Sequence, residues 1–254
     1  MSQAKIFFDA HVHLYPQFEL DVLLTAFASH ADIFASDADV LAMAVMLRGF
    51  QPTLDAVFEP FKERNLRGWT IEESEEKCYL ATDGRHRIFM LPARQVAARE
   101  RIEALGYFGE VDVPDGLPLE ETVGRLGDAG YQPVIAWGLG KWLFKRGSVV
   151  ASALESAGKA GKPLPVCDCA LRPTFWPTPQ LYKRAVELGG FVLYGSDPLP
   201  RIGDEYSAGS YAMLLEAPFD ETTPATSMLS AIRTSALTPV GKRHGLAGTL
   251  RRLH

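Results

Sequence analysis

The sequence has few cysteines, no long hydrophobic run and no excess of positive charge. Its three cysteines, among 254 residues, fit neither a disulfide framework nor a zinc ribbon. The longest uninterrupted apolar run, Val40 to Leu47, has eight residues, whereas a membrane-spanning helix needs about 20. Lysine and arginine number 26 against 31 aspartates and glutamates. We therefore expect neither a nucleic-acid nor a membrane partner.

The chain begins without the features of a secretion signal. The start, MSQAKIFFDAHVH, has one lysine and a short apolar run that ends in polar residues, so a cytoplasmic protein is expected. The composition is that of a globular protein, with 47% hydrophobic and 22% charged residues. Because α/β barrels of about 250 residues form one domain and no repeat or linker interrupts the sequence, residues 1–254 are expected to form a single barrel domain.

Short β-rich apolar segments alternate with amphipathic segments. The predicted strands are Lys5–Asp9, Val40–Leu47, Lys77–Ala81, Arg87–Leu91, Gly106–Glu110, Pro133–Trp137, Leu164–Asp168 and Phe191–Tyr194. The predicted helices are Phe18–His30, Leu54–Arg64, Val96–Leu105, Leu119–Ala129, Ser148–Ala160, Pro179–Leu188 and Pro224–Ser235. This alternation is typical of a parallel sheet, with one hairpin inserted at Thr82-Asp83-Gly84.

The sequence favours a closed barrel over an open nucleotide-binding sheet. No Gly-x-Gly-x-x-Gly follows the first strand, and no Gly-x4-Gly-Lys-Ser/Thr occurs in the sequence. We expect an α/β fold, a distorted TIM-like (β/α) barrel that could have seven strands. After Asp197 the chain looks irregular up to the last predicted helix.

Two polar segments follow predicted strands. Asp9-Ala10-His11-Val12-His13 comes directly after the first strand, and period-two alternation would point Asp9, His11 and His13 the same way. Paired imidazoles at a strand end suit a divalent metal, although a histidine pair bonded to the backbone is an alternative.

The second segment, Gly195-Ser196-Asp197, follows the last strand. At the carboxyl end of a barrel strand, the Asp197 carboxylate would face the histidines and could ligate metal or accept a proton. The alternative is a turn or N-cap aspartate.

These two segments resemble the PHP (polymerase and histidinol phosphatase) metal-dependent phosphoesterases and the related amidohydrolase barrels. Two middle segments are also similar to PHP strand ends, Leu91–Val96 to Pro-Gly-x-Glu-Ile and Pro133–Gly138 to an apolar run followed by Ala-His-Pro. The resemblance spans about residues 5–200. It implies a barrel and a metal held by His11, His13 and Asp197, with zinc, manganese or iron as the candidates.

The resemblance is incomplete at three positions. Gln95 stands where the pattern has a metal-bridging glutamate, Trp137 where it has a histidine, and Leu199 where it has the second ligand of Asp-x-His. We therefore expect one or two metal ions at most, with Glu110 or Asp168 as possible additional ligands.

Two cations follow other predicted strands. Lys141 lies in a glycine-bearing loop, and Arg172 follows the strand that ends at Asp168. Both could hold a phosphate or carboxylate, with Gln95 and Trp137 also contacting the substrate. The alternatives are solvated side chains, an Arg172–Asp168 ion pair, and core packing for Trp137.

The predicted function is hydrolysis of a small anionic, phosphoester-like substrate by metal-activated water. Asp197 would accept the proton of the water, and Lys141 and Arg172 would neutralise developing charge. The alternative is a barrel that has lost catalysis, in which the metal could be absent, and that binds a small anion or a protein without turnover. Stoichiometric metal in the purified protein would separate the two functions. The sequence leaves the substrate, the metal and the oligomeric state open.

Overall fold

The computed structural model describes residues 3–49, 51–108, 112–243 and 245. The strands are β1 (Gln3–Val12), β2 (Val40–Leu47), β3 (Thr70–Glu73), β4 (Tyr79–Thr82), β5 (Arg87–Ala97), β6 (Glu103–Tyr107), β7 (Gln132–Ala136), β8 (Val166–Cys169), β9 (Val192–Gly195), β10 (Tyr211–Pro218) and β11 (Thr238–Gly241). The α-helices are α1 (Leu20–Phe34), α2 (Leu54–Phe58), α3 (Leu119–Asp128), α4 (Lys145–Lys159), α5 (Gln180–Glu187) and α6 (Pro224–Thr234), and the 3-10 helices are η1 (Glu59–Phe61), η2 (Glu75–Lys77) and η3 (Asp204–Ser207). Within these described residues, no helix is long and apolar enough to cross a membrane.

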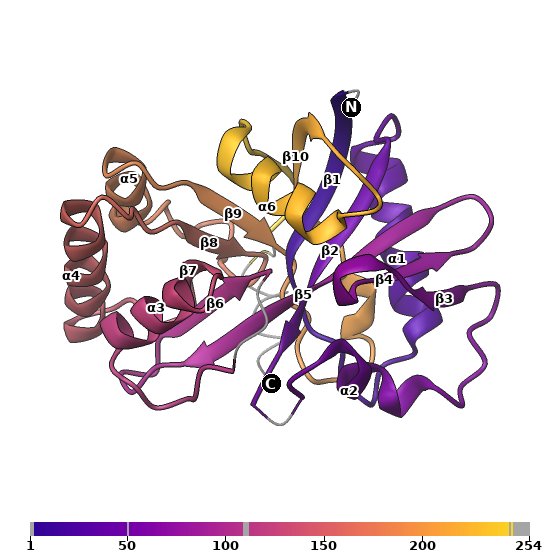
Figure 1. Ribbon diagram of the computed structural model, residues 1–254, viewed down its shortest axis with the longest axis horizontal. Coiled ribbons are helices and arrows are strands. Elements are labelled where there is room, and N and C mark those ends of the chain that lie inside the picture. The colour runs from indigo at the N-terminus through magenta and orange to yellow at the C-terminus, as the bar shows by residue number, and fades with distance from the viewer. Residues whose placement is uncertain (1–2, 50, 109–111, 244, 246–254) are drawn as a thin grey trace.

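The sheet curves into a nearly closed barrel with helices around it (Figure 1). In the described chain, seven strands follow one another around it in the order β1, β2, β5, β6, β7, β8, β9. The end of β9 returns to β1, where the Asp197 N–H donates to the His11 carbonyl at 2.8 Å. The prediction of a distorted TIM-like α/β barrel is confirmed, as is the hairpin, formed by β4 and β5.

The barrel is only partly parallel, which corrects two predictions. β6 runs antiparallel to both β5 and β7, and the helix predicted over Val96–Leu105 is absent from these described residues. Instead the chain reverses after β5, where the Ala98 N–H donates to the Ile102 carbonyl at 2.9 Å. Val96 and Ile102 are buried in one apolar cluster outside the barrel, so tertiary packing outweighs the helix-like spacing.

Three strands at the edges of the sheet, β3, β10 and β11, were not predicted from the sequence. β10 pairs antiparallel with β1 and β11 with β10, while β3 pairs with β4. The glycines and prolines after Asp197 suggested irregular chain, and the apolar segment Tyr211–Pro218 was overlooked among them. On the side away from β2, the edge of β1 pairs with this segment. The pairing satisfies the backbone N–H and C=O groups of β1.

Helices cover the outside of the barrel and one end of it. α1 packs on the outer side of β1 and β2, and α3, α4 and α5 cover β6 to β9. Side chains of α6, including Met228 and Ile232, join the inner core formed by residues such as Phe8 and Leu193. Because α6 closes the end near the start of β1, the opposite end, where β1 finishes, is left for the polar residues.

Candidate metal centre

A β-bulge near the end of β1 turns both histidines toward the barrel mouth. The pairing with β2 shifts by one residue between Asp9 and Val12. Phe7 and Val12 therefore pack in the same outer cluster although five positions separate them, while Ala10 belongs to the inner core. His11 and His13 flank Val12 on the opposite face of the strand. The prediction that Asp9 points with the histidines is wrong, because the extra residue breaks the alternation.

Asp9 instead links β1 through hydrogen bonds to the segment that carries Asp197. Its buried carboxylate accepts hydrogen bonds from the Ser196 N–H at 2.9 Å, the Ser196 hydroxyl at 2.5 Å and the Gly209 N–H at 2.9 Å. Burial raises the pKa of Asp9 from 3.8 to about 6, although these hydrogen bonds oppose the shift. Gly195 is required here, because a Cβ at this position would lie 2.5 Å from the Cβ of His11.

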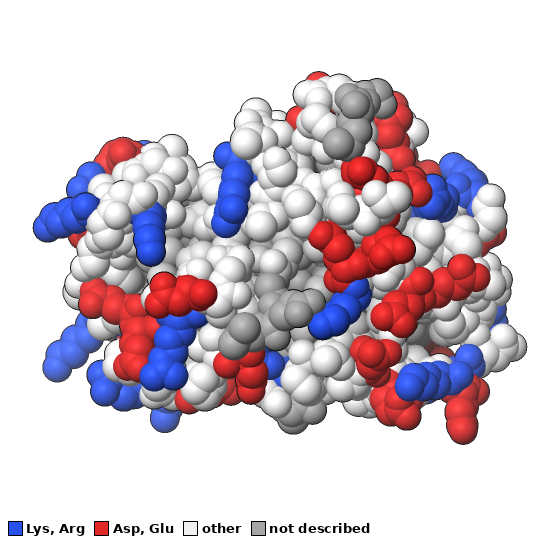
Figure 2. Space-filling view, viewed as in Figure 1, with Lys and Arg blue, Asp and Glu red and all other residues white. Residues whose placement is uncertain are grey.

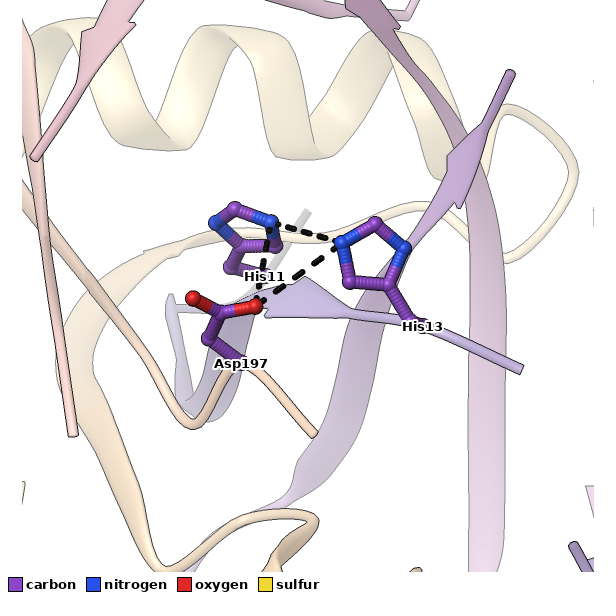
Figure 3. Close-up of side chains that lie close together, drawn as sticks. All are labelled: His11, His13 and Asp197. Carbon is purple, nitrogen blue, oxygen red and sulfur yellow. Dashed lines mark hydrogen bonds and ion pairs between the residues drawn. The ribbon is translucent and has the colours of Figure 1, made fainter. Parts of the chain in front are cut away.

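His11, His13 and Asp197 converge on one point (Figure 3). The two Nε2 atoms are 3.2 Å apart, and Asp197 Oδ1 lies 3.7 Å from that of His11 and 3.8 Å from that of His13. Both imidazoles are nearly fully buried, whereas Asp197 is 16% exposed. Asp197 also has a left-handed backbone, with φ of 50°, a conformation that aspartate tolerates better than most residues and that occurs at functional sites.

The donor set fits one divalent cation. Two metal–nitrogen bonds of about 2.0–2.1 Å at a tetrahedral angle separate the nitrogens by roughly 3.4 Å, close to the distance between the two Nε2 atoms. Burial, together with the charges of His11 and Arg48, holds the pKa of His13 well below its usual value. The His13 imidazole is therefore neutral near pH 7, which is the protonation state that binds metal.

Gln95 and Tyr15 complete the surroundings of the histidines. Gln95 Oε1 lies 3.1 Å from His11 Nε2, so the residue that replaces the expected glutamate does reach the site. The Tyr15 ring packs against His13 with the ring centres 5.4 Å apart. This packing orients His13, whose buried Nδ1 has no hydrogen-bond partner among the described residues.

The charges of two cations act on His13, and only one of these cations, Lys141, was predicted. The charges of Arg48 and Lys141 both act on the pKa of His13, and the Arg48 guanidinium lies over the Tyr15 ring at 4.8 Å. Lys141 is paired with Glu103, with 2.5 Å between Nζ and Oε1. The signal for Arg48 was available in the sequence, because a charged residue directly follows the apolar run Val40–Leu47.

The structure does not bring Arg172 or Trp137 to this site. Arg172 forms a buried bidentate ion pair with Asp168, at 2.7 and 2.6 Å, so Asp168 is not available as a metal ligand either.

Trp137 lies in the outer cluster against Trp176, because alternation along β7 turns Ala136 inward and Trp137 outward. Leu199 also packs against that outer cluster. Glu110 lies outside the described residues.

Similar proteins were found through structure and not through sequence. No family model matches the chain, and no curated protein matches it significantly. The structure of PsfC from Pseudomonas syringae PB-5123 is similar with a TM-score of 0.58 and 14% identity, over 100% of this chain and 96% of that one. A two-domain protein of Bacteroides vulgatus ATCC 8482, containing a predicted PHP-like metal-dependent phosphoesterase, is similar with a TM-score of 0.52 and 10% identity, over 98% of this chain and 69% of that one.

The chain has the PHP-like fold. In this PHP-like barrel, His11, His13 and Asp197 lie together as the resemblance implied, and two of the three departures from the pattern, Trp137 and Leu199, are packed in apolar surroundings. The third departure, Gln95, keeps its side chain at the candidate metal centre but supplies a neutral amide where a carboxylate was expected.

Proposed function

We propose that this PHP-like barrel is a metal-dependent hydrolase of small phosphate esters that works with a single divalent ion. The observation that carries the proposal is the convergence of His11, His13 and Asp197, whose ligand atoms all lie within 4.8 Å of one another. Bound zinc, manganese or iron would lower the pKa of a water molecule and polarise a phosphoryl oxygen.

The protein's own groups would bind the substrate and manage charge. The charges of Arg48 and Lys141 act on His13, and these two side chains would attract the dianionic phosphate and neutralise its developing charge. Glu103 holds Lys141 in place. The Asp197 carboxylate, partly exposed beside both imidazoles, would accept a proton from the attacking water.

One feature of the site favours the alternative, a barrel that binds a small anion without turnover. The amide of Gln95 replaces a carboxylate beside His11, which lowers the negative charge available to hold a cation. Arg48 and Lys141 would still attract an anion. The two functions differ in whether the folded protein retains stoichiometric metal.

Metal content and turnover of the same preparation distinguish them. The protein is produced in medium supplemented with zinc, manganese and iron, and metal per chain is measured by elemental analysis alongside hydrolysis of p-nitrophenyl phosphate. We expect about one metal per chain, lost in His11→Ala/His13→Ala but kept in the control His86→Ala, whose imidazole pairs with Asp83 in a distant hairpin. A folded, metal-free wild type would overturn the hydrolase and favour the anion-binding barrel.

The anion-binding role of the two cations has its own measurement. Arg48→Met and Lys141→Met should each lower kcat/KM for p-nitrophenyl phosphate roughly 10- to 100-fold, since a charge-assisted hydrogen bond contributes about 1.5–3 kcal/mol. Metal content should not change in either variant. If both variants hydrolyse the ester like the wild type, the phosphate is bound elsewhere.

A further inference from the structure

A cavity lies outside the barrel, on the other side of β9 from the candidate metal centre. It occupies about 550 Å³ between α5, β9 and β10, and His11, His13 and Asp197 are not among the described residues that line it. Leu193 points into the inner core, so its neighbour Tyr194 faces outward into the cavity. A volume of this size is in the range of small-molecule sites, about 300–1,000 Å³.

A buried ion pair forms the floor of this cavity. The Asp168 carboxylate accepts hydrogen bonds from Arg172 Nε at 2.7 Å and Nη2 at 2.6 Å. It also accepts from the hydroxyls of Tyr182 and Tyr211, each at 3.0 Å, and from the Cys169 N–H at 3.0 Å. These contacts occupy the carboxylate fully and fix the guanidinium and both phenols in place.

The fixed guanidinium keeps donors for a ligand. Of its five N–H groups, two point at Asp168 and a third donates to the Trp176 carbonyl at 2.9 Å. The remaining two have no acceptor among the described residues. The Tyr194 hydroxyl likewise has no hydrogen-bond partner in the described part of the chain, and burial raises the pKa of Tyr194, so this hydroxyl remains a donor.

The charge of the cavity favours an anion. Asp168 is neutralised by Arg172, and Glu187 at the rim pairs with Arg184 at 3.1 Å. Two lining cations are left, Lys183 on α5 and Arg243 after β11. Within the described residues neither has a carboxylate partner, and Arg243 donates only to the Pro173 and Trp176 carbonyls.

The walls favour a flat apolar body attached to that anion. The rings of Tyr182, Tyr194 and Tyr211 line the cavity together with Val186 and Val192. Tyr194 and Tyr211 meet edge to face, with ring centres 5.7 Å apart. Tyr182 and Tyr211 are mostly buried, so the partly exposed Tyr194 ring offers the larger surface for packing. We propose that this cavity is a binding site for a small aromatic carboxylate, with the carboxylate toward Arg172 and Lys183 and the ring among the tyrosines.

Benzoate titration tests the site, with benzamide as the neutral probe of the same shape. Binding is measured by calorimetry at low salt with chelator present, in the wild type and in His11→Ala/His13→Ala, because β9 connects this cavity to Asp197. We expect saturable benzoate binding that is equal in both proteins and roughly five-fold or more tighter than benzamide binding.

Two variants that leave the Asp168–Arg172 pair intact locate the binding site. Lys183→Met and Tyr194→Ala should each weaken benzoate binding several-fold, whereas the control Lys159→Met, an exposed lysine in α4, should bind like the wild type. Equal affinity for benzamide, no effect of either variant, or loss of binding in the double histidine variant would overturn the proposal. None of these results bears on metal-dependent hydrolysis, which is assayed separately.

Discussion

Gln95 supplies a neutral amide to the candidate metal centre where the sequence resemblance implied a carboxylate. Its Oε1 already lies 3.1 Å from His11 Nε2, so a carboxylate of the same length would reach the same point. We expect Gln95→Glu to bind zinc at least roughly ten-fold more tightly, because an anionic oxygen is a stronger ligand than an amide. Zinc titration by calorimetry measures this, with the exposed Gln180→Glu as a control for added charge.

A result of unchanged zinc affinity and stoichiometry in Gln95→Glu would mean that this side chain does not contact the metal. A second zinc ion bound by the variant would instead show that the amide is what restricts the site to one.

Asp9 should make the stability of the metal-free protein depend on pH. Its pKa is raised by burial to about 6, so the folded protein keeps this proton up to a higher pH than the unfolded chain does. The contribution of protonated Asp9 to the free energy of unfolding is therefore complete below about pH 4 and is lost as the pH rises to about 6. The loss is on the order of 2–3 kcal/mol.

Urea unfolding of the wild type and Asp9→Asn, with chelator, at pH 4, 5, 6 and 7 measures this effect. Between pH 4 and 6, the free energy of unfolding of the wild type should fall relative to that of Asp9→Asn. Above pH 6, the difference between the two proteins should stay constant. Parallel behaviour over the whole range would contradict the shifted pKa.

At the scale of elements, the contact between β9 and β1 holds the ligands together. A methyl group at Gly195 would lie 2.5 Å from the Cβ of His11 and 2.6 Å from its backbone nitrogen. Gly195→Ala should push the two strands apart, with a cost of roughly 1–3 kcal/mol and a loss of metal affinity. The matched control is Gly124→Ala in α3, where a Cβ meets nothing within 4 Å and should be neutral or slightly stabilising.

Unfolding midpoints and zinc affinity of the two glycine variants provide the measurement. Normal zinc binding by a destabilised Gly195→Ala would show that β9 does not position Asp197 through this contact.

At the scale of the whole molecule, the Asp168–Arg172 pair joins parts of the chain around β9. Through Tyr182 and Tyr211 it connects β8, α5 and β10. Arg172→Met leaves a buried carboxylate without its cation and should cost about 3–5 kcal/mol of unfolding free energy. Arg125→Met, which breaks only the exposed pair with Glu121, should cost less than about 1 kcal/mol.

Metal per folded chain should stay at the wild-type level in Arg172→Met, because this pair lies outside the candidate metal centre. Loss of stability no greater than in Arg125→Met, or loss of metal from folded Arg172→Met, would contradict this structural role.

Charge is unevenly spread over the face of the molecule shown in Figure 2. On the face shown in Figure 2, lysines and arginines are scattered, and carboxylates gather toward the half that carries β3 and β4. The net charge is −5. This face therefore offers no continuous basic surface for a polyanion.

The sequence alone determined the alternation of elements and the candidate ligands at the ends of β1 and β9. Local patterns carry these features, because apolar strands, amphipathic helices and a polar residue after a strand are all read within a few positions. His11, His13 and Asp197 were identified in this way, and the structure places their ligand atoms together. The PHP-like barrel followed from the same residues.

Only the tertiary structure decided which side each polar residue faces. A one-residue bulge separates Asp9 from the histidines, and the alternation along β7 turns Trp137 outward. Arg172 forms an ion pair with Asp168, and Arg48, which was not predicted from the sequence, acts on the pKa of His13 through its charge. Strand register and the pairing of buried charges depend on neighbours far away in the chain, so no local pattern specifies them.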